Sequence, residues 1–411
     1  MVMRITQSHK ILDSILLSLL VFSGGGLLFV LNRNLFSVLL CVVAVFALLF
    51  FGKKITKNNF NSSFFGIAIL TFIVLMNYFV SPGSQIFLKY GFHLLNITSC
   101  VLIYLHFQNN RTEKYFLQRI RFILKIIMYY SLVNFIAYFF IKGNLTDIYG
   151  GWNNDFVTKT FNYIFFYEPE KNAFNFFGIE LIRNQGWFWE PGVNQVYLNL
   201  YLYLEGFVFK RSKWTIPLVV FAILTTYSTT GIFIMIVLLF FIFLKLIRRN
   251  PVLYIIIGSL ILMPIYYIAQ TNIEAKSTEK ASSMNKRIFD LVQPFYIALD
   301  HPITGVGFDL EHFQKFRSEY YLDDETQSLL ITETTEKGSS NSITFLMATT
   351  GFPVSLFLIY CLFKQQLFRY RQEIFMFIIV VSVMSEPLLL RPFYLILIVS
   401  GLISIINKFT K

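Results

Sequence analysis

Long uncharged apolar segments constrain this chain more than any other feature of its sequence. Leu35–Phe51, Ile232–Leu244 and Val252–Ile268 contain no charged side chain. A membrane core of about 30 Å is crossed by roughly 20 apolar residues in helical form. Lipid offers no partners for unpaired backbone groups, so such segments cross it as helices. Only 14% of the residues are charged, against about 25% in soluble domains, and the sequence predicts an all-α integral membrane protein.

The hydropathy pattern predicts about twelve transmembrane helices, over 11–31, 35–51, 60–80, 86–107, 122–141, 192–209, 214–227, 230–247, 251–270, 341–363, 374–389 and 392–406. When the N-terminus is placed in the cytoplasm, nineteen Lys and Arg residues fall on the cytoplasmic side. The four short outer connections hold only Arg33 and Arg391. This asymmetry follows the positive-inside rule, so we expect both termini in the cytoplasm.

Two long connections fall on the outer side and hold eighteen of the 23 carboxylates. The predicted organisation is 1–141 (helices 1–5), 142–191 (first large outer loop), 192–270 (helices 6–9), 271–340 (second large outer loop) and 341–411 (helices 10–12). Long loops in a compact protein are usually functional. We therefore expect the functional residues in these two loops.

The second loop has an apolar stripe at helical spacing. Ile288, Leu291, Val292, Phe295 and Leu299 fall on one face of Lys286–Leu299. This pattern predicts an interfacial helix, interrupted by Pro294. The following segment, 323–340, is polar and is expected to be mobile.

The most informative motif runs from Arg183 to Gly192, RNQGWFWEPG, directly before the sixth expected helix. Pro191 suits the first turn of a helix, which places Glu190 at or near the N-cap. The helix N-terminus favours an anion, and the Arg183 guanidinium matches phosphate oxygens in a bidentate manner. Trp187 and Trp189 suit sugar faces or lipid. An interfacial tryptophan belt with a capped helix accounts for the same residues.

A second motif begins at Arg287 and continues to His301-Pro302-Ile303-Thr304-Gly305-Val306-Gly307. Arg287 lies in the first half of the second outer loop, and Arg183 lies near the end of the first. Each is a candidate to hold one phosphate of a diphosphate. A lone GxG is a weak phosphate signal, and an ordinary turn explains it as well.

Several other polar residues have simple structural explanations. Ser228-Thr229-Thr230-Gly231 suits a hairpin whose hydroxyls cap the following helix. Charged or polar groups inside apolar spans should face protein or water, and they are Lys89, His93, Glu205 and Glu386. For Glu386, an ion pair with Arg391 is the simplest account. A proton path in a transporter is the alternative for this group of residues.

Composition and spacing argue against other functional classes. The net charge of +12 is distributed along the cytoplasmic edge, which argues against nucleic-acid binding. Cys41, Cys100 and Cys361 lie inside apolar segments, without the spacing of a disulfide framework or a zinc site. No metal-ligand cluster and no cofactor motif is evident. We therefore expect a metal-independent protein without a cofactor.

Four motifs, in this order, resemble the Wzy-type polysaccharide polymerase and O-antigen ligase superfamily from about residue 140 to 365. They are Arg183-x-x-Gly186 with Glu190-Pro191, Ser228-x-x-Gly231, Arg287 followed by His301-Pro302-Ile303-Thr304-Gly305-Val306-Gly307, and Asn341 before Gly351. The first five helices match that superfamily only in hydropathy. The resemblance implies a GT-C-like fold in the bacterial plasma (inner) membrane.

The resemblance also implies an inverting glycosyltransferase acting on the outer face of that membrane. Its donor and acceptor would be oligosaccharides linked to undecaprenyl diphosphate, and its further partners would be membrane lipid, a chain-length regulator and a flippase. The implied catalytic residues are Arg183, Arg287 and Glu190. The implied substrate-binding residues are Gly186, Trp187, Trp189, Asn194, His301, Gly305 and Asn341.

One departure from the superfamily pattern affects the choice of reaction. Ligases of the superfamily commonly have a His-Asn pair where this chain has Ser340-Asn341. The missing histidine favours a repeat-unit polymerase making O-antigen, capsule or exopolysaccharide over an O-antigen ligase. A flippase of lipid-linked oligosaccharides is the alternative from another class. Alternating access calls for charges along the spans, whereas the unusual residues here gather in the outer loops.

Overall fold

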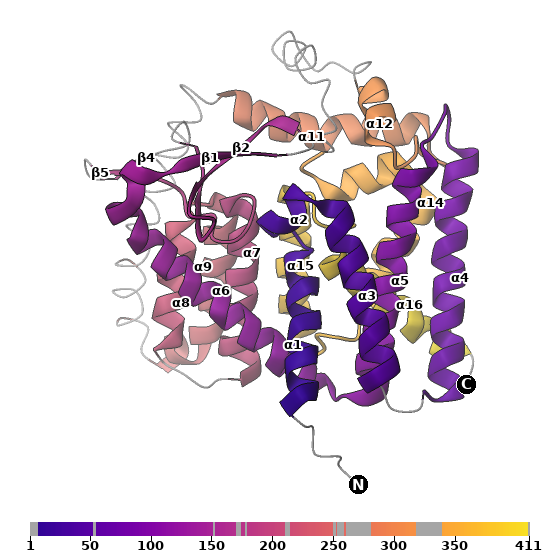
Figure 1. Ribbon diagram of the computed structural model, residues 1–411, viewed down its shortest axis with the longest axis horizontal. Coiled ribbons are helices and arrows are strands. Elements are labelled where there is room, and N and C mark those ends of the chain that lie inside the picture. The colour runs from indigo at the N-terminus through magenta and orange to yellow at the C-terminus, as the bar shows by residue number, and fades with distance from the viewer. Residues whose placement is uncertain are drawn as a thin grey trace.

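The computed structural model describes residues 7–51, 55–150, 153–169, 174–176, 179–209, 214–249, 252, 259, 281–317 and 339–409. The chain is mostly helical over these residues (Figure 1). The helices are α1 Gln7–Phe22, α2 Leu27–Leu31, α3 Arg33–Phe51, α4 Lys57–Val80, α5 Phe87–Asn110, α6 Glu113–Ile141, α7 Pro191–Tyr203, α8 Thr215–Thr225, α9 Thr229–Arg249, α11 Ala281–Asp300, α12 Leu310–Arg317, α14 Ser342–Phe363, α15 Gln372–Ser385 and α16 Pro392–Phe409. A 3-10 turn, Lys142–Asn144, follows α6, and a π-helical turn, Leu204–Phe209, follows α7.

Among the residues that the structure describes, six helices are long and apolar enough to cross a membrane: α3, α4, α5, α6, α14 and α16. Shorter apolar helices occupy Thr215–Thr225, Thr229–Leu244 and Gln372–Ser385. The predicted membrane class is therefore confirmed, whereas the count of twelve spans and the GT-C-like arrangement stay predictions. The expected span 251–270 lies outside the described residues except for Val252 and Ser259. The polar segment 323–338 lies outside them as well.

The expected first span, 11–31, is not one continuous helix. α1 ends at Phe22, and the chain turns through three glycines before α2 begins. Gly25 has a φ of +127°, which residues with a side chain rarely adopt. The turn is held from the first outer loop, since Leu27 N donates to Trp187 O at 2.8 Å and Trp189 N donates to Gly25 O at 3.2 Å. The glycines let two distant segments pair through their backbones.

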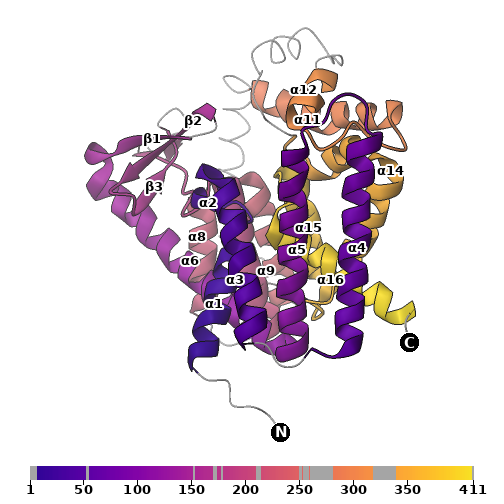
Figure 2. The same ribbon diagram turned by 45° about the vertical axis from the view of Figure 1, so that its right-hand side comes forward.

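The first large loop contains β-strands that the sequence reasoning did not predict. β1 (Thr146–Gly150), β2 (Asn153–Phe161) and β3 (Phe165–Tyr167) form an antiparallel sheet in that order. β4 (Phe174–Phe176) and β5 (Ile179–Leu181) form a second antiparallel pair. The sheet lies at the same end of the bundle as α11 and α12, opposite the start of α1 (Figures 1 and 2).

α7 is the central helix of the bundle. Each of its thirteen residues is buried, and it packs against α6, α8, α9 and α15. Its polar side chains bond within the helix and to α9. Asn199 Nδ2 donates to Gln195 Oε1 at 2.9 Å and to Gly231 O of α9 at 3.1 Å. The N-terminus of α7 therefore starts from a fixed position inside the protein.

α11 runs across the ends of the bundle helices (Figures 1 and 2). It continues through Pro294, so the predicted interruption is wrong. The helix is held on both sides of the proline: Arg317 Nη2 of α12 donates to Asp290 Oδ1, and Ile297 is fully buried against α12 and α14. The expected apolar face is on the outside, because Ile288, Leu291, Phe295 and Leu299 are each 40–48% exposed.

α14 is broken at Gly351, where φ is +74° and ψ is 170°. The segment 302–307 fills the break. Phe352 N donates to Pro302 O at 2.8 Å, and Val306 N donates to Ala348 O at 2.8 Å. The backbone groups that the break frees therefore bond to the segment that follows α11. This docking couples α11 to α14.

Candidate active site

Asn184 holds the turn that presents Arg183. Its Nδ2 donates to Ser131 O of α6 at 2.8 Å and to Thr225 Oγ1 of α8 at 2.9 Å. Its backbone N–H donates to Thr225 O at 3.0 Å. Asn194 of α7 donates to Asn184 O at 3.2 Å. Asn184 is 2% exposed, so these hydrogen bonds lie away from water. They fix the backbone at Asn184 and thereby the position of the neighbouring Arg183.

The Arg183 side chain is 30% exposed and faces Glu168, which follows β3. The two groups are 3.7 Å apart, from Nη1 to Oε1. This is longer than the roughly 2.7–3.2 Å of a direct N–H···O hydrogen bond. The guanidinium is therefore loosely paired, and an incoming phosphate oxygen can compete for its N–H groups. The sequence reasoning did not anticipate Glu168 as a neighbour.

Glu190 is the N-cap residue of α7, and Pro191 is the first helical residue, as predicted. The Glu190 side chain does not cap the helix, since it accepts no bond from the first-turn N–H groups. Its carboxyl group instead lies near Glu386, whose pKa is raised by burial and by the charge of Glu190. The Glu190 carboxyl group thus lies at the positive end of the central helix but does not cap it.

Glu386 follows the last residue of α15, in the connection to α16. Its carboxyl group lies against the first turn of α7: a β-carbon built on Gly192 would be 2.0 Å from Glu386 Oε1. Ser342, the first residue of α14, fixes the backbone, because its hydroxyl donates to Glu386 O at 2.6 Å and accepts from Leu388 N at 2.8 Å. Glu386 is 6% exposed.

The expected ion pair of Glu386 with Arg391 is absent from the described part of the chain. The Arg391 guanidinium lies over Phe29, 4.9 Å from the ring centroid, and over Trp189 at 5.8 Å. No spacing in the sequence links Glu386 to the start of α7, because this contact depends on how α15 packs beside α7. The position of Glu386 against the first turn of α7 is the feature of the site that sequence reasoning missed.

Arg287 lies on α11, one helical turn before Asp290, and its side chain is exposed. Asp290 ties this part of α11 to the residues that precede α14. Ser340 N donates to Asp290 Oδ2 at 3.1 Å, and Ser339 Oγ donates to Asp290 O at 2.6 Å. Arg287 is thereby held beside the start of α14, whose Ser342 fixes Glu386.

The charges of both predicted arginines act on Glu386. Burial raises the pKa of the Glu386 carboxyl well above its ordinary value, and the charge of Glu190 raises it further. Arg287 and Arg183 act in the opposite direction and lower it. The charges of Arg183 and Glu190 in the first long loop, and of Arg287 on α11, therefore all act on Glu386.

The two predicted tryptophans are built into the support of this site. Trp187 stacks on Tyr130 of α6, with ring centroids 3.9 Å apart. Trp189 lies beside Arg391 and is partly exposed. Gly186 has a φ of +58°, and a β-carbon there would be 3.0 Å from Asn194 Nδ2. Roles of these residues in substrate binding stay predictions.

The predicted residues of the second motif occupy different environments. His301 packs edge-on against Phe316, with centroids 5.0 Å apart. Gly305 is buried with a φ of +63°, and a β-carbon there would be 2.4 Å from the Thr349 carbonyl carbon. Asn341 is the N-cap of α14 and accepts from Thr344 N at 3.1 Å. These glycine and asparagine positions shape the backbone beside the site, and their contact with substrate stays a prediction.

The other polar residues expected inside the spans face protein groups. Lys89 Nζ is 2.8 Å from Asp309 Oδ1. Arg121 Nε donates to Glu205 Oε1 at 2.6 Å. The predicted hairpin cap is confirmed as well, since Gly231 N donates to Ser228 Oγ at 3.3 Å.

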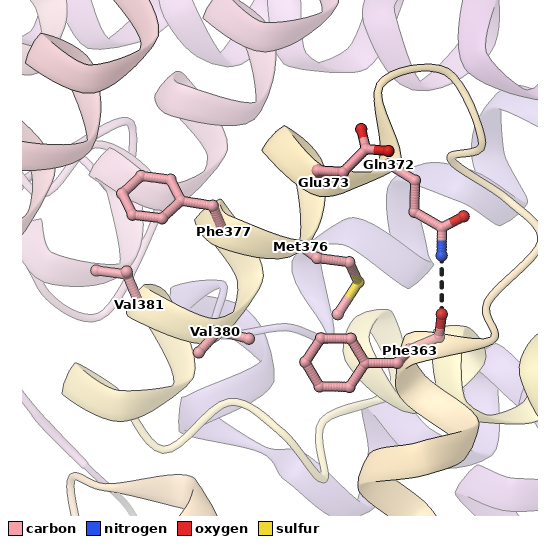
Figure 3. A pocket seen from close by; sticks show the side chains of 7 residues that line it. All are labelled: Phe363, Gln372, Glu373, Met376, Phe377, Val380 and Val381. Carbon is pink, nitrogen blue, oxygen red and sulfur yellow. Dashed lines mark hydrogen bonds between the residues drawn. The ribbon is translucent and has the colours of Figure 1, made fainter.

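A groove elsewhere on the bundle is apolar. It opens where α14 ends and α15 begins, and Gln372 Nε2 donates across it to Phe363 O at 2.8 Å (Figure 3). Its lining residues are Phe363, Gln372, Glu373, Met376, Phe377, Val380 and Val381. The lining runs along α15 as far as Val381, and Glu386 follows five residues later, about 7 Å farther along the helix axis.

Comparison with known proteins identifies part of the chain. The family model of O-antigen ligase (Wzy_C) matches residues 214–359, which run from the residue before α8 into α14 and include Arg287, His301 and Asn341. No curated protein and no solved structure matches the chain significantly. The chain is a multi-pass membrane protein whose residues 214–359 match the Wzy_C model, and this match is consistent with the O-antigen ligase and polymerase superfamily that the sequence motifs resemble.

Proposed function

We propose that the protein is a polymerase that joins oligosaccharide repeat units carried on undecaprenyl diphosphate, on the outer face of the bacterial inner membrane. The observation that carries this proposal is a buried carboxyl, Glu386, beside the N-terminus of α7, on which the charges of Arg183 and Arg287 both act. A diphosphate ester is the substrate group that such a site suits. Two guanidinium groups and a helix N-terminus all favour a polyanion.

The proposed reaction is an inverting glycosyl transfer. The acceptor hydroxyl attacks the anomeric carbon of the donor, and a new carbon–oxygen bond forms. The bond from that carbon to the diphosphate oxygen breaks, and the diphosphate leaves with the electron pair. Arg183 and Arg287 would stabilise the charge that grows on the leaving group, an effect of about 10²–10³ in rate for one well-placed donor. Glu190 would accept the hydroxyl proton.

The arrangement of the elements suits a substrate that is anchored in lipid. Arg287 lies on α11, which crosses the ends of the bundle helices, and Arg183 and Glu190 lie in the loop that leads into α7. The site is therefore at the edge of the apolar bundle, where a diphosphate headgroup would be when its isoprenoid chain is in the membrane. With this reaction we propose cytoplasmic termini, a GT-C-like enzyme without metal, and partners that deliver and limit the chains.

An O-antigen ligase is the second candidate, because the matching family model is described by that activity. Both reactions use the same donor and the same leaving group, so both suit the two arginines. The ligase differs in its acceptor. The polymerase is favoured because Ser340 stands before Asn341, where the superfamily's ligases commonly have histidine.

Purified protein supplied with one lipid-linked repeat unit tests the proposal directly. A polymerase converts it to a ladder of longer lipid-linked chains, separated by electrophoresis, without a second protein. In a deletion strain, loss of polymer with one unit still attached to the final acceptor indicates a polymerase. Loss of every attached form indicates a ligase, and repeat units trapped on the inner leaflet indicate a flippase. Either of the last two results overturns the proposed polymerase.

A further inference from the structure

We propose that Arg391, immediately before α16, forms a second anion site, which binds the diphosphate of the acceptor lipid while Arg183 and Arg287 bind that of the donor. A polymerase acts on two lipid-linked molecules at once, and each brings its own diphosphate. This inference rests on the proposed function and adds to it a site for the second substrate. Arg391 lies outside the residues that the family model matches.

The Arg391 guanidinium has no anionic partner in the described part of the chain. It forms no salt bridge there and donates no side-chain hydrogen bond, and its nitrogens are not among the fully buried unpaired atoms, so a ligand can reach them. Burial and the charge of Arg33 lower the pKa of Arg391 to about 9, so the group is still positively charged at neutral pH. A partly buried cation without a counterion is destabilising, and an anion that binds from outside removes that cost.

Two aromatic rings hold the Arg391 guanidinium in place without neutralising it. Its Cζ lies 4.9 Å from the ring centroid of Phe29 on α2 and 5.8 Å from that of Trp189. The rings are fixed relative to each other, because Trp189 N donates to Gly25 O, in the turn that leads into α2, at 3.2 Å. An aromatic ring attracts a cation but accepts none of the directed hydrogen bonds that a guanidinium offers to phosphate oxygens. The guanidinium is therefore positioned, and its N–H groups remain available to a ligand.

A second unpaired donor belongs to the same contact. The Nε1–H group of Trp189 is buried and has no hydrogen-bond partner among the described residues. An indole N–H and a guanidinium donate hydrogen bonds and accept none, so a ligand shared by Trp189 and Arg391 must supply acceptor oxygens. A buried donor without an acceptor is destabilising, and the oxygens of a diphosphate would satisfy this one together with the guanidinium.

The second site adjoins the first without sharing a residue with it. Trp189 precedes Glu190 in the chain, and Arg391 follows Glu386 by five residues, which span at most about 18 Å. Two diphosphates repel each other at such separations, so each needs its own cation. A repeat unit whose diphosphate is held at Arg391 can extend its far sugar to the anomeric carbon at the first site.

Binding of radiolabelled undecaprenyl diphosphate to the purified full-length protein, in nanodiscs of zwitterionic phospholipid, tests the inference. The wild type is expected to bind two molecules. Arg391→Gln should bind one of them about 10–10²-fold more weakly, which is the effect of losing a hydrogen bond from a charged donor. Trp189→Phe keeps an aromatic ring beside the guanidinium and removes the N–H group, so it should weaken the same molecule about 2–10-fold. Arg369→Gln, an exposed arginine in the connection between α14 and α15, is the control and should bind like the wild type.

Competition distinguishes a substrate diphosphate from an ordinary phospholipid head group. Phosphatidylglycerol added to the nanodiscs should not displace the second molecule of undecaprenyl diphosphate. If it does, the site holds membrane phospholipid, and the assignment to the acceptor is wrong. A wild type that binds one molecule, or an Arg391→Gln variant that binds two as tightly as the wild type, also overturns the second site.

Polymer formation by the same preparations separates this inference from the proposed function. With the donor chain saturating, Arg391→Gln should raise the KM for a single repeat unit as acceptor about 10-fold or more and leave kcat within about threefold, whereas a merely structural arginine would lower kcat with an unchanged KM. An unchanged acceptor KM overturns the inference while the polymerase stands. A wild type that makes no polymer overturns the proposed function, whatever the binding measurement gives.

Discussion

The Glu386 carboxyl occupies the space that a side chain at Gly192 would need, since a β-carbon on Gly192 would lie 2.0 Å from Glu386 Oε1. The atom in the way is the far end of a flexible side chain and not backbone. A larger residue at position 192 would therefore move the carboxyl group of Glu386 without moving the helices around it.

Gly192→Ala should consequently lower activity with little effect on stability. Alanine is preferred to glycine in helices by about 0.5–1 kcal/mol, which offsets the adjustment of Glu386. Misplacement of a catalytic group by about 1 Å lowers the rate by up to about 10². Thermal unfolding and polymer formation are measured together. Gly91→Ala is the control, because a β-carbon there meets nothing within 4 Å. A fully active Gly192→Ala protein would show that the position of Glu386 is unimportant.

Replacing either arginine should prevent polymer formation. Arg183→Ala and Arg287→Ala each remove one of the positive charges near Glu386, with an expected loss of about 10²–10³ in rate. Arg183→Lys should rescue poorly, because an ammonium cannot bind phosphate oxygens as a planar fork. Chain length and the amount of inserted protein are compared in a complemented deletion strain. Arg369→Ala, an exposed arginine in the connection between α14 and α15, serves as the control. Wild-type chain length in Arg183→Ala would exclude the proposed role.

Gly305→Ala should destabilise the protein, in contrast to Gly192→Ala. Its φ of +63° is strained for alanine by roughly 1–2 kcal/mol, and its β-carbon would meet the Thr349 backbone at 2.4 Å. Backbone cannot move aside as a side-chain end can, so the segment 302–307 should leave the break in α14. A lower unfolding temperature checks this expectation. Gly143→Ala, where a β-carbon meets nothing within 4 Å, should behave like wild type.

A fall in pH should weaken the ion pair of Lys89 with Asp309, which links α5 to the segment after α11. Burial alone would raise the pKa of Asp309, but the hydrogen bond and charge of Lys89 lower it below its ordinary value. A lowered folded-state pKa contributes stability above about pH 4, and this contribution disappears as the pH falls through the folded value. Asp309→Asn should cost about 1–3 kcal/mol at neutral pH and flatten the acid dependence of thermal unfolding. The exposed Asp147→Asn should leave that dependence unchanged.

Much of the fold follows from local sequence signals. Charge-free apolar segments predict helices wherever the structure describes them, with the glycine turn in 11–31 as the exception. The N-cap at Glu190 follows from Pro191, and the cap at Ser228 follows from a polar hairpin between apolar runs. Each depends on residues a few positions apart. Such signals also drew attention to Arg183 and Arg287, each in a long outer loop, and their place in the site stays a prediction.

Long-range packing explains what the sequence did not reveal. The helical period on α11 correctly predicted an amphipathic helix, but its buried side contains Asp290 and Gln293, which bond to Arg317. A polar network faces the protein together with Ile297, whereas the predicted apolar face points outward. The sequence reasoning did not recognise the strands of the first loop, which pair with one another. The contact of Glu386 with the first turn of α7 requires α15 to lie beside α7, which no local pattern encodes.

The docking of segment 302–307 into α14 has a mechanical consequence. Arg287 and Glu386 belong to a unit that α11, α14 and the connection after α15 form, whereas Arg183 and Glu190 belong to a unit anchored on α6, α7 and α8. A diphosphate bound by both guanidinium groups would add a link between these two units. When the diphosphate leaves, that link would be lost. Each sugar transfer would then change the rigidity of the helix bundle.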